Sequence, residues 1–463
     1  RCVPSHTRTP PHKSPTATTP ARKLRLRPGQ AVVAGFAAAI AVGTALLMLP
    51  IATTGPGSAT FIEALFTATS AVCVTGLTVV DTATYWTPLG QVIIIALIQV
   101  GGLGIMTVAS LLVALLSHRF ALTTALNAAE ETKALGPGQA LAVVRRVVLY
   151  SLAIETITAL ALTGRFILHY HQTPGLALWH GTFHAISAFN NAGFALWTDN
   201  LMHFVADPWI CLPIAAAIII GGIGFPVLFE LRHTWNTPNR WTIHTRIALY
   251  ATAAFLIIGW IAICALEWTN PHTMGPLDTK GKLLSGFFQS VMPRTAGFNS
   301  LDYSTMHSQT WLVTDMLMFV GGSSAGTAGG IKVTTFSVLA FVILAEVRGE
   351  PSVRVYNRRL GHGIQRAAIT VVLLSALLVI TATTVFIICT EYSLDRSLFE
   401  VISAFATVGL TTGITPTLPT PERLILVALM FIGRLGPTTF ASALALQHRR
   451  RVYELPEERP IIG

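Results

Sequence analysis

Long apolar stretches alternate with short polar segments along most of this chain. Three of the stretches run for 18 residues or more with few or no charged positions, at 30–50, 92–116 and 208–228. A helix of about 20 apolar residues is long enough to cross the hydrocarbon core of a bilayer. The pattern therefore predicts a polytopic membrane protein whose spans are α-helices.

Four segments align without gaps when each is anchored on one glycine. Each begins with a phenylalanine ten residues before that glycine, and leucine or phenylalanine always follows it. A serine stands six residues before the glycine in three segments, and Val291 is the exception. The segments are FTATSAVCVTGL at 66–77, FHAISAFNNAGF at 183–194, FFQSVMPRTAGF at 287–298 and FEVISAFATVGL at 399–410. Internal similarity of this kind predicts a repeat architecture.

Each anchor segment lies between two apolar stretches, so the predicted unit is a helix, a short half-helix with its loop, and a second helix. The flanking stretches are 30–50 and 91–116, 147–162 and 208–231, 247–266 and 311–344, and 367–388 and 424–446. We predict an all-α polytopic membrane fold with four pseudo-symmetric helix–pore loop–helix repeats around one central pore, that is, eight spans plus four half-helices. The repeats are assigned to 25–116, 117–232, 233–348 and 349–451. Residues 1–24 are expected to form a disordered basic cytoplasmic tail and residues 452–463 a C-terminal cytoplasmic tail.

Composition and charge agree with a membrane location. Only 11% of the residues are charged, whereas a soluble domain carries about 25%. Of the 31 lysines and arginines, 23 lie in the tails and in the loops after each second helix, five on the opposite side, and three at membrane depth. The positive-inside rule then places both termini in the cytoplasm and the four half-helix loops outside. The net charge of +10 is explained by this topology, with no nucleic-acid partner.

The four loops have the properties of an ion filter. Non-helical backbone at membrane depth persists only where protein buries it or where it lines a water-filled cavity. Rings of carbonyl oxygens replace the hydration shell of a cation, and glycine allows φ > 0 and close backbone approach. The predicted filter residues are Val74, Thr75, Gly76, Asn191, Ala192, Gly193, Thr295, Ala296, Gly297, Thr407, Val408 and Gly409. The alternative, small-residue turns between helices, leaves the shared phenylalanine and serine positions unexplained.

A glycine-rich run interrupts the second apolar stretch of the third repeat. It consists of Gly321, Gly322, Ser323, Ser324, Ala325, Gly326, Thr327, Ala328, Gly329 and Gly330. Five glycines in ten residues disfavour a helix. Lys332 follows the run, but Ile331 intervenes, so the phosphate-binding pattern is not met. Arg434 in the fourth repeat is a candidate functional residue, because an arginine inside the membrane is energetically costly. The alternative is a snorkelling or structurally paired side chain.

Other polar positions are open to two interpretations. Five acids near the external mouth either concentrate cations or are solvated loop acids and half-helix caps: Glu63, Asp81, Asp199, Asp302 and Glu400. Glu155 and Asp315 lie within spans and require partners that the sequence does not identify. Arg294 is expected to brace its pore helix. The glycines of GGLG at 101 and GGIG at 221 are expected to permit close helix packing.

The four loops resemble those of the Trk/Ktr/HKT potassium-transporter superfamily, and most closely those of the bacterial Ktr branch. The resembling runs are TSAVCVTGL at 69, AFNNAGF at 188, MPRTAGFNSLD at 292 and ATVGLTTGITP at 406, and the likeness extends over about 25–451. The resemblance implies a fourfold pseudosymmetric pore with one glycine in each filter loop. In the plant branch a serine at the first glycine goes with sodium selectivity, so Gly76 favours potassium. The resemblance also implies that the glycine-rich run obstructs the cytoplasmic half of the pore and that Arg434 contacts it and adds an electrostatic barrier.

The expected function is therefore the membrane subunit of a potassium uptake system, with K⁺ as the transported ion and Na⁺ as a candidate activator. The resemblance implies a homodimer in the cell membrane that works with a cytosolic nucleotide-binding regulatory ring, for which the basic segment 348–366 is a candidate docking site. No covalent cofactor, resident metal or enzymatic activity is expected. The alternative is a secondary transporter of another monovalent cation such as Na⁺, with alternating access. The coupling ion, the regulatory nucleotide and the oligomeric state stay open at this point.

Overall fold

The computed structural model of this chain describes residues 28–104, 107, 137–356 and 358–436. Most of these residues are α-helical, which confirms the predicted helical class. Among them, strands occur only in one antiparallel hairpin of β1 (Arg354–Val355) and β2 (Arg358–Arg359), with Val355 opposite Arg358. The predicted tails, 1–24 and 452–463, lie outside the described residues.

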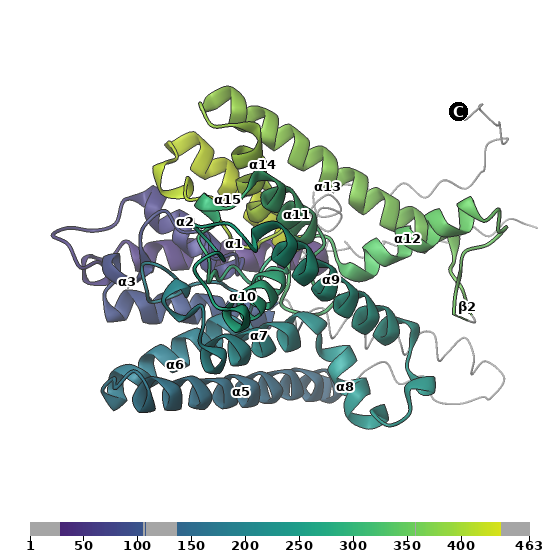
Figure 1. The fold of residues 1–463 in the computed structure, drawn as a ribbon, viewed down its shortest axis with the longest axis horizontal. Helices are drawn as coiled ribbons and strands as arrows, with labels where there is room; N and C mark the ends of the chain where they lie inside the picture. The colour runs from purple at the N-terminus through teal and green to yellow at the C-terminus, as the bar shows by residue number, and fades with distance from the viewer. Residues whose placement is uncertain (1–27, 105–106, 108–136, 357, 437–463) are drawn as a thin grey trace, which may run out of the picture.

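Four helices in the described ranges are long and apolar enough to cross a bilayer. They are α1 (Pro28–Leu47), α5 (Pro137–Leu168), α9 (Ile243–Glu267) and α13 (His362–Cys389). Each is the first helix of a predicted repeat. Leu373, Leu377 and Ile380 on α13 are exposed, and such apolar faces are compatible with lipid, which is itself apolar. Figure 1 shows α5 and α13 along opposite margins of the molecule, with α10 between them.

The predicted half-helices are present and are too short to cross a bilayer. They are α2 (Phe61–Val72), α6 (Pro174–Phe189), α10 (Thr279–Val291) and α14 (Leu394–Phe405). Side chains cap two of the first turns: Thr60 and Glu63 form a capping box on α2, and Asp278 caps α10. Short turns complete the outer connections: η1 (Pro50–Ala52), α3 (Thr82–Tyr85), η2 (Met202–Phe204), η4 (Tyr303–Thr305) and η5 (Thr415–Thr417).

The second helix is broken in the second and third predicted repeats, whereas in the first and fourth repeats it is described only as far as residues 104 and 436. These elements are Pro88–Gly104, α7 (Pro208–Ile223) with α8 (Phe225–Thr234), α11 (Ser308–Phe319) with α12 (Val333–Val347), and α15 (Thr420–Leu435). By length and composition the described residues contain four spans, or five if α7 and α8 count as one. The reason is local: Gly224 has φ of 92°, and α8 leaves α7 at 97°.

The half-helices form the centre of the main hydrophobic core. Three of the phenylalanines that define the repeat, Phe66, Phe183 and Phe399, are fully buried. The third repeat differs, because Phe288 is buried there while the aligned Phe287 is only partly buried and packs against Trp260, at a centroid distance of 5.9 Å. The shared phenylalanine is therefore a packing residue. The short turn η3 (Pro238–Arg240) joins α8 to α9.

Candidate functional site

The four loops share one unusual backbone conformation. The anchor glycines have positive φ: Gly76 at 91°, Gly193 at 70°, Gly297 at 73° and Gly409 at 95°. The residue two positions earlier is also left-handed in every loop: Val74 at 56°, Asn191 at 59°, Thr295 at 67° and Thr407 at 51°. A left-handed conformation costs a residue other than glycine about 1–2 kcal/mol. Its use at the same place in four loops means that the surrounding structure imposes the loop shape.

The loops meet in cyclic order, with each glycine packed against the next loop. In each case a Cβ atom added to the glycine would clash with a carbonyl oxygen of the next loop, that of the residue just before its own anchor glycine. The distance would be 2.8 Å for Gly193 and shorter for the other three. The pairs are Gly76 with Ala192, Gly193 with Ala296, Gly297 with Val408, and Gly409 with Thr75. No side chain at these positions fits without a backbone shift, which explains why all four are glycine.

The serine of the repeat holds the loop to its own half-helix. Ser70 Oγ accepts a hydrogen bond from the Gly76 amide at 3.0 Å, and Ser403 Oγ accepts one from Gly409 at 3.1 Å. In the second repeat the Ser187 hydroxyl instead donates to the Phe194 carbonyl at 2.8 Å. The third repeat has Val291 at this position, and its half-helix ends there, whereas the other three continue until four residues before the glycine.

His184 is a site residue that the sequence reasoning missed. It is fully buried on α6, nine residues before Gly193. Its Nδ1 faces the His180 carbonyl at 2.7 Å and therefore donates, so Nε2 is free to accept from the Leu196 amide at 3.2 Å. The ring also stacks on Trp197 with centroids 4.2 Å apart. A neutral imidazole thus fixes the chain that leaves the second loop.

Glu400 occupies the same repeat position on α14, and neither a cation-concentrating acid nor a solvated loop acid describes it. The side chain is fully buried, so it is not a solvent-facing acid. Its Oε1 accepts from Thr411 Oγ1 at 2.6 Å and from the Thr412 amide at 2.9 Å, and its Oε2 accepts from Thr415 Oγ1 at 2.6 Å. The carboxylate therefore holds the chain that leaves the fourth loop. Alignment of the four repeats places His184 and Glu400 in one column, which is the signal that would have identified both.

The other acids near the external mouth are mostly caps. Asp81 accepts from the Ala83 amide at the start of α3, and Asp302 accepts from the Ser304 amide at η4. Asp199 is half-buried on the outer connection. Burial alone would raise the pKa of the Glu63 carboxyl, but its hydrogen bonds from Thr60 and Tyr85 lower that pKa below its ordinary value. Capping therefore accounts for Glu63, Asp81 and Asp302, the second of the two interpretations.

Glu155 has partners directly behind the second loop. Both carboxylate oxygens accept from Gln99 Nε2 at 3.1 Å, and Asn190 Nδ2 donates to Oε1 at 3.2 Å. Asn190 immediately precedes the loop residue Asn191. The network therefore joins α5, the helix Pro88–Gly104 and the end of α6. Asp315 on α11 is buried, and its Oδ1 has no hydrogen-bond partner in the described structure.

The glycine-rich run forms a non-helical segment, 320–332, between α11 and α12. Its two ends are joined by backbone hydrogen bonds from the Gly321 amide to the Ile331 carbonyl, 2.8 Å, and from the Val333 amide to the Gly322 carbonyl, 3.0 Å. The segment is also bonded to α7, because the Ser323 backbone amide donates to the Gly222 carbonyl at 2.9 Å. The predicted interruption of the third repeat's second helix is confirmed.

The segment 320–332 also lies against the third and fourth loops. A Cβ atom on Gly330 would stand 3.1 Å from the Cα of Ala406, and one on Gly321 would stand 3.2 Å from Cγ2 of Thr295. A Cβ atom on Gly329 would overlap the Thr407 hydroxyl. These contacts place the segment directly beside the cyclic arrangement of loops.

Arg434 contacts the segment, as expected from the sequence. It is buried on α15, and its Nη1 donates to the Thr327 carbonyl. Its Nη2 donates to the Gly101 carbonyl at 3.1 Å. The Lys332 ammonium donates to the Ala328 carbonyl within the segment. One guanidinium thus joins the second helices of the first, third and fourth predicted repeats.

Arg294 behaves differently from its expected role of bracing the pore helix. Its Nη2 donates to Thr252 Oγ1 on α9 at 3.3 Å and to the Gly321 carbonyl at 3.4 Å. Its guanidinium carbon also lies 5.7 Å from the centre of the Phe255 ring. Arg294 therefore joins α9 to the segment 320–332. The correction follows from its position: it precedes the left-handed Thr295, beyond the end of α10.

Close packing at the helix glycines is confirmed. A Cβ atom at each of three positions would overlap the carbonyl oxygen of the last residue of a half-helix: Gly101 with Val72, Gly221 with Phe189, and Gly433 with Phe405. In the first, second and fourth repeats the second helix therefore packs against the end of its own half-helix. In the second repeat the GGIG sequence at 221–224 also contains the bend between α7 and α8.

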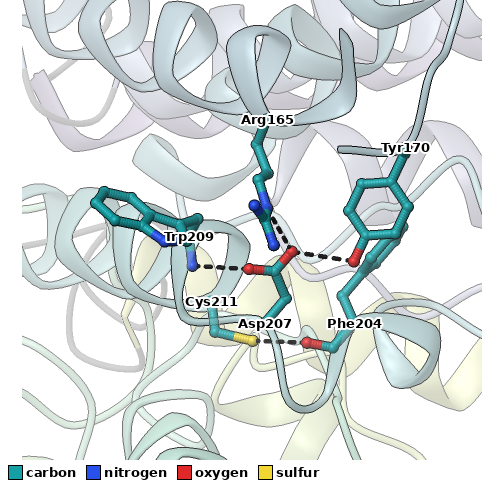
Figure 2. A network of polar contacts seen from close by, with 6 residues as sticks. All are labelled: Arg165, Tyr170, Phe204, Asp207, Trp209 and Cys211. Carbon is teal, nitrogen blue, oxygen red and sulfur yellow. Dashed lines mark hydrogen bonds and ion pairs between the residues drawn. The ribbon is translucent and has the colours of Figure 1, made fainter. Parts of the chain in front are cut away.

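A polar network fastens the outer end of α5 to the start of α7 (Figure 2). Arg165 Nε and Asp207 Oδ2 are 2.8 Å apart, the one ion pair between a basic residue and a carboxylate in the part of the chain that is described. Tyr170 donates to the same oxygen at 3.0 Å, while the Trp209 amide donates to Oδ1 at 3.0 Å and caps α7. Cys211 Sγ lies 3.3 Å from the Phe204 carbonyl. This network stabilises the frame around the second loop.

Comparison with known proteins gives three kinds of match. The TrkH family model, described as a cation transport protein, matches residues 16–451. The chain is 43% identical over 422 residues to "Ktr system potassium uptake protein B" of Bacillus subtilis, covering 91% of this chain and 94% of the relative. It is 36% identical to "Potassium/sodium uptake protein NtpJ" of Enterococcus hirae, covering 95% and 98%. The crystal structure of the potassium transporter TrkH from Vibrio parahaemolyticus superposes with a TM-score of 0.71 at 17% identity, covering 92% of this chain and 86% of that one.

Proposed function

Because this chain belongs to the TrkH family of cation transport proteins, we propose that it is the membrane subunit of a potassium uptake system. Membership confirms the resemblance drawn from the four loop sequences. Relatives named for potassium uptake support K⁺ as the transported ion, and the Enterococcus relative named for potassium and sodium keeps Na⁺ as the alternative. The observation that carries the proposal is the cyclic contact of four glycine loops.

The proposed selectivity filter is the ring that these loops form. Its backbone is non-helical, buried and turned to positive φ at matching places, and such backbone at membrane depth is tolerated where it lines a pore. Carbonyl oxygens of the residues before each glycine would replace the hydration shell of K⁺. The hydroxyls of Thr75, Thr295 and Thr407 are buried without a hydrogen-bond partner in the described structure, so they are additional oxygens available to water or a cation. The four predicted repeats would then surround one pore.

The proposed gate is the segment 320–332 with Arg434. The contact of the segment with two of the four loops supports this proposal, in which the segment obstructs an ion that has passed the filter. Arg434 and Lys332 add positive charge at the same place, and a low-dielectric environment increases the repulsion of a permeating cation. Hydrogen bonds to Thr327 and Gly101 hold the obstructing conformation. Opening requires that the segment leave Arg434 or move together with it.

The proposed assembly is a homodimer in the cell membrane with both termini in the cytoplasm. A cytosolic nucleotide-binding ring is the proposed regulator, and the basic segment 348–366 is its proposed docking region. In this segment Arg348 and Glu350 line a groove of about 490 Å³ with Arg354. Charged side chains at an exposed groove are suited to a partner that binds and dissociates.

The test is potassium and sodium uptake in a bacterium that lacks its own potassium uptake systems, with the regulatory partner supplied. We expect the chain to restore growth at low external potassium and to favour K⁺ over Na⁺. Gly193→Ala is the matched filter variant and should lower the preference for K⁺, because its Cβ would stand 2.8 Å from the Ala296 carbonyl oxygen. Sodium uptake without potassium uptake would establish the alternative, a sodium transporter. Uptake of neither ion would refute a cation transport function.

A further inference from the structure

A groove of about 950 Å³ lies between the connection from α8 to α9 and the β1–β2 hairpin. Its walls come from two distant parts of the chain, residues 239–246 on one side and Tyr356 with Arg358 on the other. The contact between them is a cation–π interaction, with the Arg246 guanidinium 5.2 Å from the centre of the Tyr356 ring. Figure 1 shows the hairpin at the same end of the molecule as α8.

The groove is strongly basic. Arg240, Arg246 and Arg358 line it, and no aspartate or glutamate is among its lining residues. Arg246 donates to the carbonyls of Pro238 and Asn239, at 3.1 Å and 2.8 Å, and is held in place. In the described part of the chain, the guanidiniums of Arg240 and Arg358 have neither an ion pair nor a side-chain hydrogen bond. Two exposed guanidiniums without a protein partner in the described residues therefore line one groove together with a third that is already positioned.

The carboxylate that is hydrogen-bonded to the groove residue Thr242 is already engaged. Glu230 on α8 accepts from the Thr242 amide and from the hydroxyls of Thr242, 2.8 Å, and Thr245, 2.6 Å. It is fixed at the start of α9 and is not among the residues that line the groove. The binding capacity of the groove therefore resides in the arginine side chains.

The groove lies at the boundary of a membrane span. α9 is one of the four helices long enough to cross a bilayer, and it begins at Ile243, among the residues that line the groove. Trp235 on the same connection is 72% exposed, and Trp241 is fixed by a hydrogen bond from its Nε1 to the Thr234 carbonyl at 3.0 Å. Tryptophan and tyrosine concentrate at the headgroup level of membranes. We therefore expect the arginines to lie at the depth of lipid phosphates.

We propose that this groove binds the phosphate headgroup of an anionic membrane phospholipid. Guanidinium groups form bidentate hydrogen bonds with phosphate oxygens, and three of them around one groove match a phosphodiester with an acidic or hydroxylated headgroup. The position beside exposed tryptophan favours a lipid over a soluble anion or an acidic protein. The inference rests on the membrane placement of α9 and not on which ion the chain transports.

The test is native mass spectrometry of the purified chain in detergent with added phosphatidylglycerol. We expect a retained lipid on the wild type, and weaker retention of phosphatidylcholine. The double variant Arg240→Gln, Arg358→Gln should bind phosphatidylglycerol on the order of twentyfold more weakly, since each basic residue near a membrane surface contributes about a fivefold factor. The matched control is Arg145→Gln, Arg146→Gln, which removes two exposed arginines of α5 outside the groove.

Competition and folding controls separate the possible ligands. Millimolar inorganic phosphate should not displace the lipid, and displacement would overturn the lipid assignment in favour of a free anion. Thermal unfolding of the double variant without added lipid should match the wild type, whereas phosphatidylglycerol should raise the melting temperature of the wild type alone. Equal lipid retention by the double variant and the wild type would refute the proposal, even if the variant lost its cytosolic partner. Because no transport is measured, failure here is distinguishable from failure of the proposed function.

Discussion

The carbonyl oxygen of Thr75 occupies the place that a Cβ atom on Gly409 would need, so the last of the four loops packs directly against the first. This contact closes a ring that begins with Gly76 against Ala192. Backbone touches backbone at all four junctions, and no side chain can yield to relieve a clash. The width of the ring is therefore set by the main chain of all four loops together.

Gly76→Ser should lower potassium selectivity. The serine Cβ would overlap the Ala192 carbonyl, and Gly76 has φ of 91°, a conformation that side chains rarely adopt. If about 1.4 kcal/mol of the resulting strain is released by widening the ring, the ratio of K⁺ to Na⁺ uptake falls about tenfold. Ion uptake measured in cells checks this. Gly35→Ser is the control, because a Cβ there has nothing within 4 Å and the ratio should not change.

Arg434→Ala should increase unregulated potassium flux. The variant removes the hydrogen bonds to Thr327 and Gly101 as well as the buried positive charge. Charge-assisted hydrogen bonds contribute about 1.5–3 kcal/mol each, so we expect a rise of at least about tenfold in flux without the regulatory partner. Flux into proteoliposomes measures it. Arg434→Lys separates the two effects, because lysine retains the positive charge but cannot donate from two Nη atoms to the two carbonyls. We expect this variant to have an intermediate flux.

Glu400→Ala should destabilise the fourth loop. The substitution leaves the buried Thr412 amide and the hydroxyls of Thr411 and Thr415 without their acceptor. Each unsatisfied buried donor costs about 1–3 kcal/mol, so a loss of roughly 3 kcal/mol in the free energy of unfolding is expected, with loss of potassium uptake. Thermal unfolding in detergent measures the first effect. Glu400→Gln retains an acceptor oxygen and should lose less than half as much; equal losses would argue against the positioning role.

Asp207→Asn should weaken the outer frame without altering selectivity. The amide can still cap α7 through its oxygen, but it loses the ion pair with Arg165 and one strong acceptor for Tyr170. Arg165 is partly exposed, so the expected loss is small, about 1 kcal/mol. A lower melting temperature with an unchanged K⁺ to Na⁺ ratio is the expected result. A change in selectivity would show that the second loop depends directly on this network.

Sequence alone was sufficient where a pattern repeats and insufficient where contacts are made between repeats. The half-helices follow from the length of the apolar segments, and the break between α11 and α12 follows from glycine content. Both are local properties of the sequence. Glu400 was misjudged because its acceptor role depends on three threonines that lie beyond the loop. Likewise Arg294 contacts Gly321 and Thr252, which no sequence spacing brings together.

The direction of the chain after each break was also beyond the sequence pattern. Hydropathy counts apolar residues, and it treats 208–231 and 311–344 as continuous runs. Gly224 turns the first by 97°, and the segment 320–332 divides the second. The two breaks are joined by backbone hydrogen bonds, such as that from the Ser323 amide to the Gly222 carbonyl. These bonds compensate for the helical hydrogen bonds that are lost at the breaks. Glycine content suggested where a break was possible but gave no direction for the chain that follows.

The joined ends of the segment 320–332 make it an insertion that leaves the path of the chain unchanged. Gly321 is hydrogen-bonded to Ile331, and Val333 to Gly322, so α11 and α12 meet at one point whatever the intervening residues do. A compact loop of this kind, closed at its neck, can swing or lengthen without moving the helices that bear it. Evolution could therefore alter its length and composition, and with them the ease of opening of the proposed gate, while the scaffold stays fixed.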